Sequence, residues 1–363
     1  MDLSEQNVLL FSRSTQHGGT ENVIFQICKI LLPVANKVIV CSADGYRIDL
    51  LRKIGVKHYI IPDIEEKSPK TIMKVLSVVS NIIKNEKITI IHTHHRMAAF
   101  YTVLLSIKYR FCFMNTSHNT FFNKKFLTKI AYKKANLIAC GEMVKKNLID
   151  IYGINEKRVT VIHNSVEPFT DKIVADKLLL DLRNQGNILV ANIGRLSKQK
   201  GMEYFIQSYP YVKNRNNHVK FIIVGDGEDR KKLESMVKEN NDENNFYFLG
   251  YRNDIRNVMS QVDFIVLSSL WEGLPLTPIE AFSVKKTVIG TAVDGTVEII
   301  EDSDNGYLIE PGNSKRIAEK IIELIDNTKL RKTFEEKAYR RFEEEFSFHV
   351  YRERIIQYYY DHC

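Results

Sequence analysis

Short apolar runs alternate with amphipathic stretches along the first half of the chain. Residues 7–12 are typical of a buried strand, and residues 21–32 carry apolar side chains at the i, i+3, i+4 and i+7 spacing of an amphipathic helix. Further strand-like runs stand at 38–41, 88–92, 111–115, 137–139 and 159–162. This alternation predicts a mostly parallel sheet that is covered by helices.

The same alternation starts again after a break at 168–186, a stretch that is typical of a connector. Strands are predicted at 187–194, 221–224, 246–248, 263–267, 287–290 and 307–309, with helices near 202–212 and 229–239. We therefore predict an α/β fold of two facing, doubly wound, Rossmann-like domains, residues 1–167 and residues 168–346. Ligands bind at the carboxyl ends of the strands in such sheets, so the cleft between the domains is the candidate site.

The composition narrows the class of protein. The chain has 363 residues, of which 44% are hydrophobic and 26% charged, and this excludes disordered, collagenous and low-complexity proteins. Its net charge of +8 is uneven, because residues 1–170 carry +11 and the remainder −3. Residues 108–146 hold nine basic side chains against one acid, Glu142. This basicity permits nucleic acid, an anionic membrane surface or an anionic substrate as the partner.

The cysteines and the chain start predict a cytoplasmic protein. The five cysteines make an odd number without a C-x-x-C pair, so we expect neither a disulfide framework nor a zinc knuckle, and a reducing cytosol fits. The polar start Met-Asp-Leu-Ser-Glu is no signal peptide. The apolar stretch 97–107 is too short for a bilayer, which needs about 20 residues. The protein is expected to be soluble, or peripheral to a membrane.

The first candidate site follows the strand predicted at 187–194. The run Gly194-Arg195-Leu196-Ser197-Lys198-Gln199-Lys200-Gly201 places a guanidinium and an ammonium on one loop. Arginine binds phosphate through paired hydrogen bonds and lysine adds a point charge, so Arg195 and Lys200 suit a diphosphate. A solvated basic loop is the alternative interpretation.

Two carboxylates, Glu272 and Glu280, flank the second candidate site. The run Thr277-Pro278-Ile279-Glu280 has the pattern of a capping box with proline at the first helical position, which would make Glu280 a cap residue. Either way, residues 272–276 are expected at a helix N-terminus, where free N–H groups favour an anion. Carboxylates there accept hydrogen bonds from diols, so sugar and ribose hydroxyls are the expected partners.

Weaker motifs stand at the ends of other predicted strands. Gly18-Gly19-Thr20-Glu21 allows close approach to a phosphate, although a glycine turn with a Thr cap is common. Gly225-Asp226-Gly227 lacks the third glycine of a dinucleotide-binding fingerprint, so we infer no NAD site. His118 is either a site histidine or a structural one. His92-x-His94-His95 has no carboxylate at ligand spacing, so we expect no metal.

Residues 121–134 predict a basic amphipathic helix. On such a helix Phe122, Phe126 and Ile130 share one face, and Lys125, Lys129 and Lys133 share another. This pattern fits adsorption to anionic lipid. A core-facing helix with a solvated lysine face is the alternative interpretation.

Taken in order, these motifs resemble those of the retaining GT-B nucleotide-sugar glycosyltransferases of glycosyltransferase family four, of the bacterial surface-polysaccharide type. The resemblance rests on Gly18-Gly19-x-Glu21, His118, Gly194-Arg195…Lys200-Gly201, Gly225-Asp226-Gly227 and Glu272-x7-Glu280. Residues 161–167 resemble the domain-junction turn, and residues 290–300 resemble the glycine-containing turn of the family. Ser165 and Asp294 stand where glycine is common, which concerns backbone turns rather than chemistry.

The resemblance implies a role for each site residue. Arg195 and Lys200 would hold the donor diphosphate and stabilise its charge as it leaves, without a metal or other cofactor. Glu272, Gly273 and Leu274 would hold the donor sugar, Glu280 the ribose diol, and His118 the sugar near the reacting carbon. The expected substrate-binding set also includes Gly18, Gly19, Gly194, Gly225 and Thr277. Residues 347–363 resemble the helix that returns to the first domain in this family. The first domain would be the acceptor side, and the second domain, 168–346, would bind the donor.

The implied function is transfer of a hexose or N-acetylhexosamine, with a UDP-sugar as the expected donor, to a lipid-linked or polysaccharide acceptor in surface-glycan assembly. The protein would be cytoplasmic and peripheral on the inner face of the cell membrane, with residues 121–134 on the anionic surface. The alternatives are a nucleotide-sugar 2-epimerase of the same fold and a non-catalytic partner subunit of a transferase. Nucleic-acid binding is not expected, because no recognition motif accompanies the basic residues.

Overall fold

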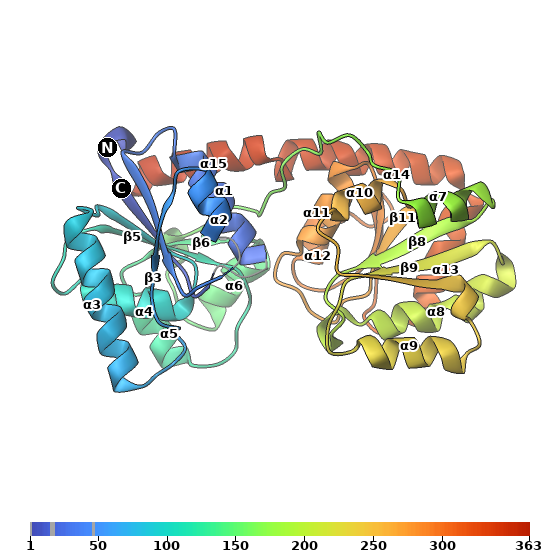
Figure 1. The fold of residues 1–363 in the computed structure, drawn as a ribbon, viewed down its shortest axis with the longest axis horizontal. Coiled ribbons are helices and arrows are strands. Elements are labelled where there is room, and N and C mark those ends of the chain that lie inside the picture. Colours follow the sequence, from blue (N-terminus) through green and yellow to red (C-terminus); the bar gives the residue numbers. More distant parts are fainter. Residues whose placement is uncertain (1, 15–18, 46–47) are drawn as a thin grey trace. The chain divides into compact units, whose positions relative to one another are not determined.

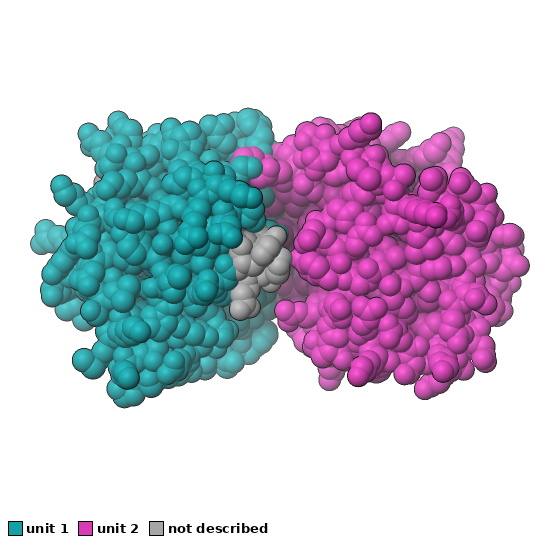
Figure 2. Space-filling model, in the orientation of Figure 1, with its two compact units in different colours: residues 1–164, 349–363 teal, residues 165–348 magenta. Residues whose placement is uncertain are grey.

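The computed structural model describes residues 2–14, 19–45 and 48–363 of the chain. The chain forms two compact units, which Figure 2 shows in teal and magenta. Unit 1 consists of Met1–Asn164 and His349–Cys363, and unit 2 of Ser165–Phe348. The first unit therefore contains both ends of the chain, and the second is inserted between them.

Unit 1 is built on a sheet that, in the described residues, has seven parallel strands (Figure 1). They are β1 (Asn7–Phe11), β2 (Lys37–Ser42), β3 (Lys57–Ile60), β4 (Ile90–Thr93), β5 (Cys112–Ser117), β6 (Asn136–Ala139) and β7 (Val159–Val161). The spatial order is β3-β2-β1-β4-β5-β6-β7, so the order reverses between β1 and β4. The edge strand β3 was not expected, because its half-buried, partly charged residues give no apolar run.

Helices cover the sheet of unit 1. They are α1 (Gly19–Leu31), α2 (Ile48–Lys53), α3 (Pro69–Asn85), α4 (Arg96–Leu105), α5 (Lys125–Tyr132), α6 (Glu142–Asp150) and α15 (Phe348–His362). Helix α3 shows how the sequence starts a helix here. The Ser68 hydroxyl accepts a hydrogen bond from the Thr71 N–H, and Pro69 occupies the first turn, where its missing N–H costs nothing.

The last helix ties the end of the chain to unit 1. Tyr359 of α15 is buried, and its hydroxyl lies 2.8 Å from Nδ1 of His92 on β4. Beyond the helix, Cys363 forms a disulfide with Cys112 of β5. The sequence predicted no disulfide framework, and it did not predict this single disulfide. The two cysteines are 251 residues apart in sequence, so only the return of α15 to the sheet brings them together.

Unit 2 repeats the architecture with a sheet of six parallel strands in the part of the chain that the structure describes. They are β8 (Ile188–Ile193), β9 (Val219–Val224), β10 (Phe246–Gly250), β11 (Phe264–Leu267), β12 (Val288–Thr291) and β13 (Gly306–Ile309). The order is β10-β9-β8-β11-β12-β13, and it reverses between β8 and β11. Both sheets thus confirm the predicted doubly wound α/β architecture.

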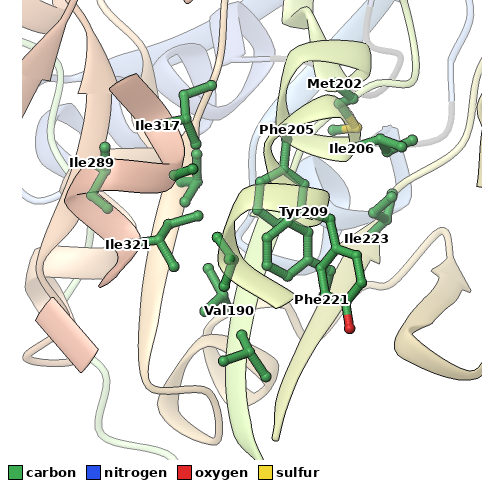
Figure 3. Packing of buried hydrophobic residues seen from close by; sticks show 14 of the residues in the cluster. Val190, Met202, Phe205, Ile206, Tyr209, Phe221, Ile223, Ile289, Ile317 and Ile321 are labelled. Carbon is green, nitrogen blue, oxygen red and sulfur yellow. The ribbon is translucent and has the colours of Figure 1, made fainter. Parts of the chain in front are cut away.

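The helices of unit 2 bury a large apolar core against its sheet. They are α7 (Lys177–Asn184), α8 (Met202–Arg215), α9 (Arg230–Glu239), α10 (Ile255–Ser260), α11 (Leu276–Ser283), α12 (Thr296–Ile299), α13 (Ser314–Asp326) and α14 (Thr328–Arg341). Figure 3 shows α8 side chains over the sheet, where the rings of Phe205 and Phe221 stack with their centroids 4.1 Å apart. This packing holds α8 against the sheet, and the loop 194–201 of the candidate site connects β8 to α8.

Across the described ranges, no helix combines the length and the hydropathy that crossing a bilayer requires.

Candidate functional site

The candidate site of unit 2 lies where its strand order reverses. Strands β8 and β11 are hydrogen-bonded neighbours, with Phe264 opposite Val190. The chain leaves β8 into residues 194–201 and leaves β11 into residues 268–275, so both segments meet at the carboxyl end of the sheet. A crevice at such a switch point is where doubly wound sheets bind their ligands.

Close backbone packing positions Lys200. Gly201 has φ +54°, and a Cβ atom there would lie 2.4 Å from the Ser268 carbonyl oxygen, so only glycine fits. The Ser268 hydroxyl donates to the Lys200 carbonyl at 3.1 Å and accepts from the Asn192 amide at 2.8 Å. The aliphatic stem of Lys200 passes over Gly194, where an added Cβ atom would lie 3.4 Å from the Lys200 Cε, an ordinary contact distance.

Lys200 and Glu272 form the central ion pair of this region. The Lys200 Nζ lies 2.5 Å from Glu272 Oε1, and the Ser269 hydroxyl donates to the same oxygen at 2.6 Å. The side chains are only 18% and 7% exposed, so the pair is shielded from salt more than a surface pair. Arg195 is exposed, and no carboxylate of the described ranges pairs with it.

The helix after Glu272 starts earlier than the sequence predicts. Helix α11 begins at Leu276 with Pro275 as its N-cap, and no side chain caps it. The capping-box interpretation of Thr277 and Glu280 is therefore wrong. Pro275 is an extended residue with a φ of −69°, which already suits the entry to a helix, so the start shifts upstream of the predicted box. Glu280 stands inside the helix and is released from a capping role.

Glu280 shares an electrostatic environment with Lys200. Burial raises the pKa of the Glu280 carboxyl, and the charges of Arg256 and Lys200 oppose that rise. Thr277, in the first turn of α11, is half-buried. Lys200 thus forms an ion pair with Glu272 and also acts on the charge of Glu280, eight residues further along the chain.

Two further glycines shape the loops by close approach. A Cβ atom on Gly225, after β9, would lie 1.9 Å from the Gly194 carbonyl oxygen, so Gly225 packs directly on the loop 194–201. A Cβ atom on Gly295 would lie 1.9 Å from the Gly273 oxygen and 2.6 Å from the Leu274 Cα. The turn 290–300 therefore supports the segment that the resemblance assigns to the donor sugar.

Histidines gather at the corresponding end of the sheet in unit 1. His92 is the last but one residue of β4, His94 and His95 follow the strand, and His118 follows the adjacent strand β5. The rings of His92 and His94 stack at 4.4 Å, and those of His94 and His118 at 5.5 Å. Among the described residues, no group of three or more possible ligands is arranged to hold a metal ion. Of the glycine motif, Gly19 begins α1, whereas Gly18 lies outside the described residues.

The hydrogen bonds of this stack assign the His118 tautomer. Burial lowers the pKa of His118 to about 4 and the pKa of His94 well below its usual range, so both rings are neutral near pH 7. His94 Nδ1 lies 3.2 Å from His118 Nε2, while the buried His94 Nε2 has no partner in the described chain. An unpaired buried acceptor is more common than an unpaired donor. We therefore place the proton on His94 Nδ1, which leaves His118 with its proton on Nδ1.

The predicted basic helix is shorter and differently oriented than expected. Only Lys125–Tyr132 is helical, as α5, and its buried residues are Thr128, Ala131 and Tyr132. Phe122 and Phe126 are 72% and 76% exposed. The core-facing interpretation is therefore wrong for these two phenylalanines, which stand in solvent together with the exposed lysines 125, 129 and 133.

The structure thus brings together the predicted residues of unit 2, while His118 and Gly19 belong to unit 1. Sequence reasoning missed Ser268, Ser269 and Gly295, which order the loops around Lys200 and Glu272. The two serines directly follow the predicted strand 263–267, and this position was the available signal. For Gly295, the only signal in the sequence was its position in the turn 290–300.

Comparison with known proteins supports the resemblance. Residues 17–168 match the family model "Glycosyltransferase Family 4", and residues 181–341 match "Glycosyl transferases group 1". An uncharacterized glycosyltransferase of Methanocaldococcus jannaschii is 30% identical over 278 residues, 74% of this chain and 74% of that protein. The UDP-Gal:alpha-D-GlcNAc-diphosphoundecaprenol alpha-1,3-galactosyltransferase of Escherichia coli is 27% identical over 314 residues, 80% of each chain.

Solved structures agree with the sequence relatives. The crystal structure of Anabaena HepE in complex with UDP-glucose superposes with a TM-score of 0.83 and 22% identity, and it covers 98% of this chain and 100% of that one. At this identity the likeness defines the fold. The chain therefore belongs to the glycosyltransferases of group 1 and family 4, and it has the GT-B fold.

Proposed function

We propose that the protein transfers a hexose or N-acetylhexosamine, with retention of anomeric configuration, from a UDP-sugar to a lipid-linked or polysaccharide acceptor in surface-glycan biosynthesis. The Escherichia coli relative, named for a UDP-galactose donor and a diphosphoundecaprenol-linked acceptor, supports the substrate classes. The Anabaena structure with UDP-glucose supports the donor. The reaction needs no metal or other cofactor in this proposal.

The observation that carries the proposal is the Lys200–Glu272 pair at the switch point of unit 2. The two groups neutralise each other at 2.5 Å, so an arriving diphosphate competes with Glu272 for the ammonium. Once Lys200 turns to the phosphate, Glu272 is free to accept hydrogen bonds from the sugar hydroxyls. Arg195, exposed and without a carboxylate partner in the described ranges, adds a second cation for the same diphosphate.

The start of α11 supplies the neutral donors. The first N–H groups of a helix have no partner within it, so Leu276 and Thr277 offer backbone N–H groups to oxygen atoms of the nucleotide sugar. Gly273 and Leu274, before Pro275, add the N–H groups of the preceding loop. Glu280, one turn further, accepts from the ribose diol. Its raised pKa falls when a hydroxyl donates to the carboxylate, because that bond favours the charged form.

The chemistry follows from these groups. The bond between the anomeric carbon and the UDP oxygen breaks, and the acceptor oxygen bonds to the same face of the sugar. The acceptor proton passes to an oxygen of the departing phosphate, whose negative charge Arg195 and Lys200 stabilise. His118 presents its Nδ1–H as a neutral donor to the sugar, which agrees with its lowered pKa.

A panel of nucleotide sugars tests the proposal. Each is scored for thermal stabilisation, for slow hydrolysis, and for consumption that depends on a lipid-diphosphate-linked sugar or on a glycan. We expect one UDP-sugar to stabilise the protein and to be consumed only when acceptor is added. Donor turnover to an epimer without acceptor would establish the epimerase instead, and the absence of stabilisation by any nucleotide sugar would reject donor binding.

The proposal also places residues 121–134 on an anionic membrane at the cytoplasmic side. Lysines 125, 129 and 133 are exposed beside Phe122 and Phe126. Each lysine near such a surface contributes about 1 kcal/mol, so reversing all three to Glu should weaken partition onto phosphatidylglycerol vesicles by at least about 100-fold. The matched control reverses Lys231, Lys238 and Lys315, three exposed lysines of unit 2. Equal partition of both variants onto the vesicles would show that residues 121–134 do not bind the membrane.

A further inference from the structure

A cavity of about 220 Å³ lies in unit 1 between α4 and α5. Its apolar lining comes from Ile72, Met97, Phe100, Leu127 and Ala131. Three cations, Lys67, Arg96 and Lys124, line it as well. We propose that this cavity binds the first part of an isoprenoid diphosphate, with the diphosphate on the three cations and the start of the hydrocarbon chain on the apolar lining. The inference rests on the proposed function, because it assigns the site of a lipid-linked acceptor.

The cations are arranged as a site for an anion. Lys67 and Lys124 are close enough to interact, and the neighbouring ammonium of Lys67 lowers the pKa of Lys124. Within the described ranges neither lysine has a carboxylate oxygen within 4.0 Å of its ammonium, although Glu65 is near enough to act on the charge of Lys124. The acid that lines the cavity, Glu65, is shared between Arg13 at 3.7 Å and His95 at 3.5 Å. The charges of Lys67 and Arg96 act against the Lys124 ammonium, whereas Glu65 acts in its favour, and a phosphate bound among the three cations would offset their repulsion.

The backbone at Lys124 is strained. Its φ of +54° lies in the left-handed region, and as the N-cap of α5 it makes no side-chain capping bond. A residue with a Cβ atom pays roughly 1–2 kcal/mol for this conformation, which glycine would avoid. The strained residue is one of the two lysines that line the cavity, and backbone strain of this kind is concentrated at ligand sites.

Arg96 is held ready by two contacts. Its guanidinium lies 3.9 Å from the centroid of the Phe121 ring, and it donates to the Asn123 side-chain oxygen at 3.1 Å. A planar guanidinium fixed in this way retains donors for paired hydrogen bonds to phosphate. The lysines alone could serve any anion, whereas Arg96 adds the geometry that a diphosphate uses.

The apolar lining decides between an isoprenoid diphosphate and a water-soluble anion. Leu127 lines the cavity and is 49% exposed, and its neighbour Phe126 is 76% exposed. A nucleotide or a free glycan has no hydrocarbon to cover these groups. The cavity is smaller than the roughly 300–1,000 Å³ of a complete small-molecule site. It therefore suits the head of a long lipid whose remaining chain stays in the bilayer.

Calorimetric titration of the full-length protein tests the site. The probe is farnesyl diphosphate below its micelle concentration, added to protein saturated with UDP so that the nucleotide site is occupied. Inorganic diphosphate and farnesol are the comparison ligands. We expect farnesyl diphosphate to bind at least tenfold more tightly than either. Equal binding of inorganic diphosphate would overturn the apolar half of the proposal, and equal binding of farnesol the cationic half.

Matched variants locate the binding. Lys67→Gln with Lys124→Gln should weaken farnesyl diphosphate binding at least tenfold, whereas Lys70→Gln with Lys74→Gln, on exposed positions of α3, should leave it unchanged. Lys124→Gly should weaken binding while the melting temperature stays equal or rises, since glycine relieves the strain. Unchanged binding in the first variant overturns the site. Affinity for the UDP-sugar is measured in parallel, so failure of donor binding and failure of this site are separate results.

Discussion

The two units use their cations in opposite ways. Unit 2, within the half of the chain whose net charge is −3, holds Lys200 in a glycine-shaped loop, 2.5 Å from Glu272. Unit 1 contributes most of the +11 half, and its lysines 67, 124, 125, 129 and 133 are exposed. Net charge therefore does not show where a small anion is held. The nearly neutral unit has the more precisely positioned ammonium, and the basic unit offers a surface.

The units also differ in their buried titratable groups. At the carboxyl end of the unit 1 sheet they are histidines, which burial keeps neutral, as the pKa of about 3 for His92 shows. At the carboxyl end of the unit 2 sheet they are the carboxylates Glu272 and Glu280, which lie near Lys200. Neutral histidines are suited to hydrogen bonding, while paired charges are suited to exchange with an anion. The two units therefore offer different chemistry.

The largest effect should come from Lys200→Ala. Removing a cation that stabilises the leaving diphosphate should lower kcat/KM by about 10²–10³-fold, as losses of such groups do. Lys198→Ala, an exposed lysine on the same short loop, should have little effect. Circular dichroism verifies that both variants fold. Similar activity in the two variants would mean that unit 2, like unit 1, offers only a diffuse basic surface.

An intermediate effect should come from Gly295→Ala. The new Cβ atom would lie 1.9 Å from the Gly273 oxygen, and overpacking of this kind costs about 1–3 kcal/mol. The displaced segment 273–274 should weaken donor binding by tenfold or more, which Trp271 fluorescence can follow, since it is the chain's one tryptophan.

The control for that variant is Gly186→Ala. Gly186 has φ +79° but open space around its Cα, so alanine should cost roughly 1–2 kcal/mol of stability. Donor affinity should stay unchanged, because only the backbone is strained. If Gly186→Ala weakened donor binding as much as Gly295→Ala, a loss of global stability rather than a displacement of segment 273–274 would be the cause.

The smallest expected effect is a loss of stability of unit 1 at acid pH. Burial lowers the pKa of His92 from 6.5 to about 3, so below pH 6.5 the unfolded chain binds a proton that the folded unit excludes. This stability is present above pH 6.5 and is lost as the pH falls, by about 2 kcal/mol between pH 6.5 and 5. At pH 5, unit 1 should therefore unfold at a lower urea concentration than unit 2. The unfolding curve from circular dichroism, which reports both units, should then no longer coincide with the curve from Trp271 fluorescence, which reports unit 2.

Two substitutions sharpen that measurement. His92→Gln should reduce the pH dependence, because the buried position no longer titrates. His218→Gln, at an exposed position of unit 2, should leave it unchanged. Coincident unfolding curves at both pH values would show that the two units do not differ in acid sensitivity.

Periodicity predicted the fold because most strands here are buried and apolar on both faces. It missed β3, whose exposed edge residues lack that pattern. It also missed the Cys112–Cys363 disulfide and the true start of α11, because both depend on tertiary context. The ordered motifs identified Lys200 and Glu272, but their direct contact, the support from Ser269 and the buried histidine stack required the folded chain.

The return of α15 sets an order of events during synthesis. Residues 349–363 are translated after unit 2, yet unit 1 needs them to bury Tyr359 against His92. At roughly 5–20 residues per second, the ribosome needs roughly 10–40 s for the inserted segment 165–348. Throughout that interval the sheet of unit 1 lacks its closing helix. Unit 1, whose translation begins first, is therefore completed only after the whole of unit 2 has been synthesised.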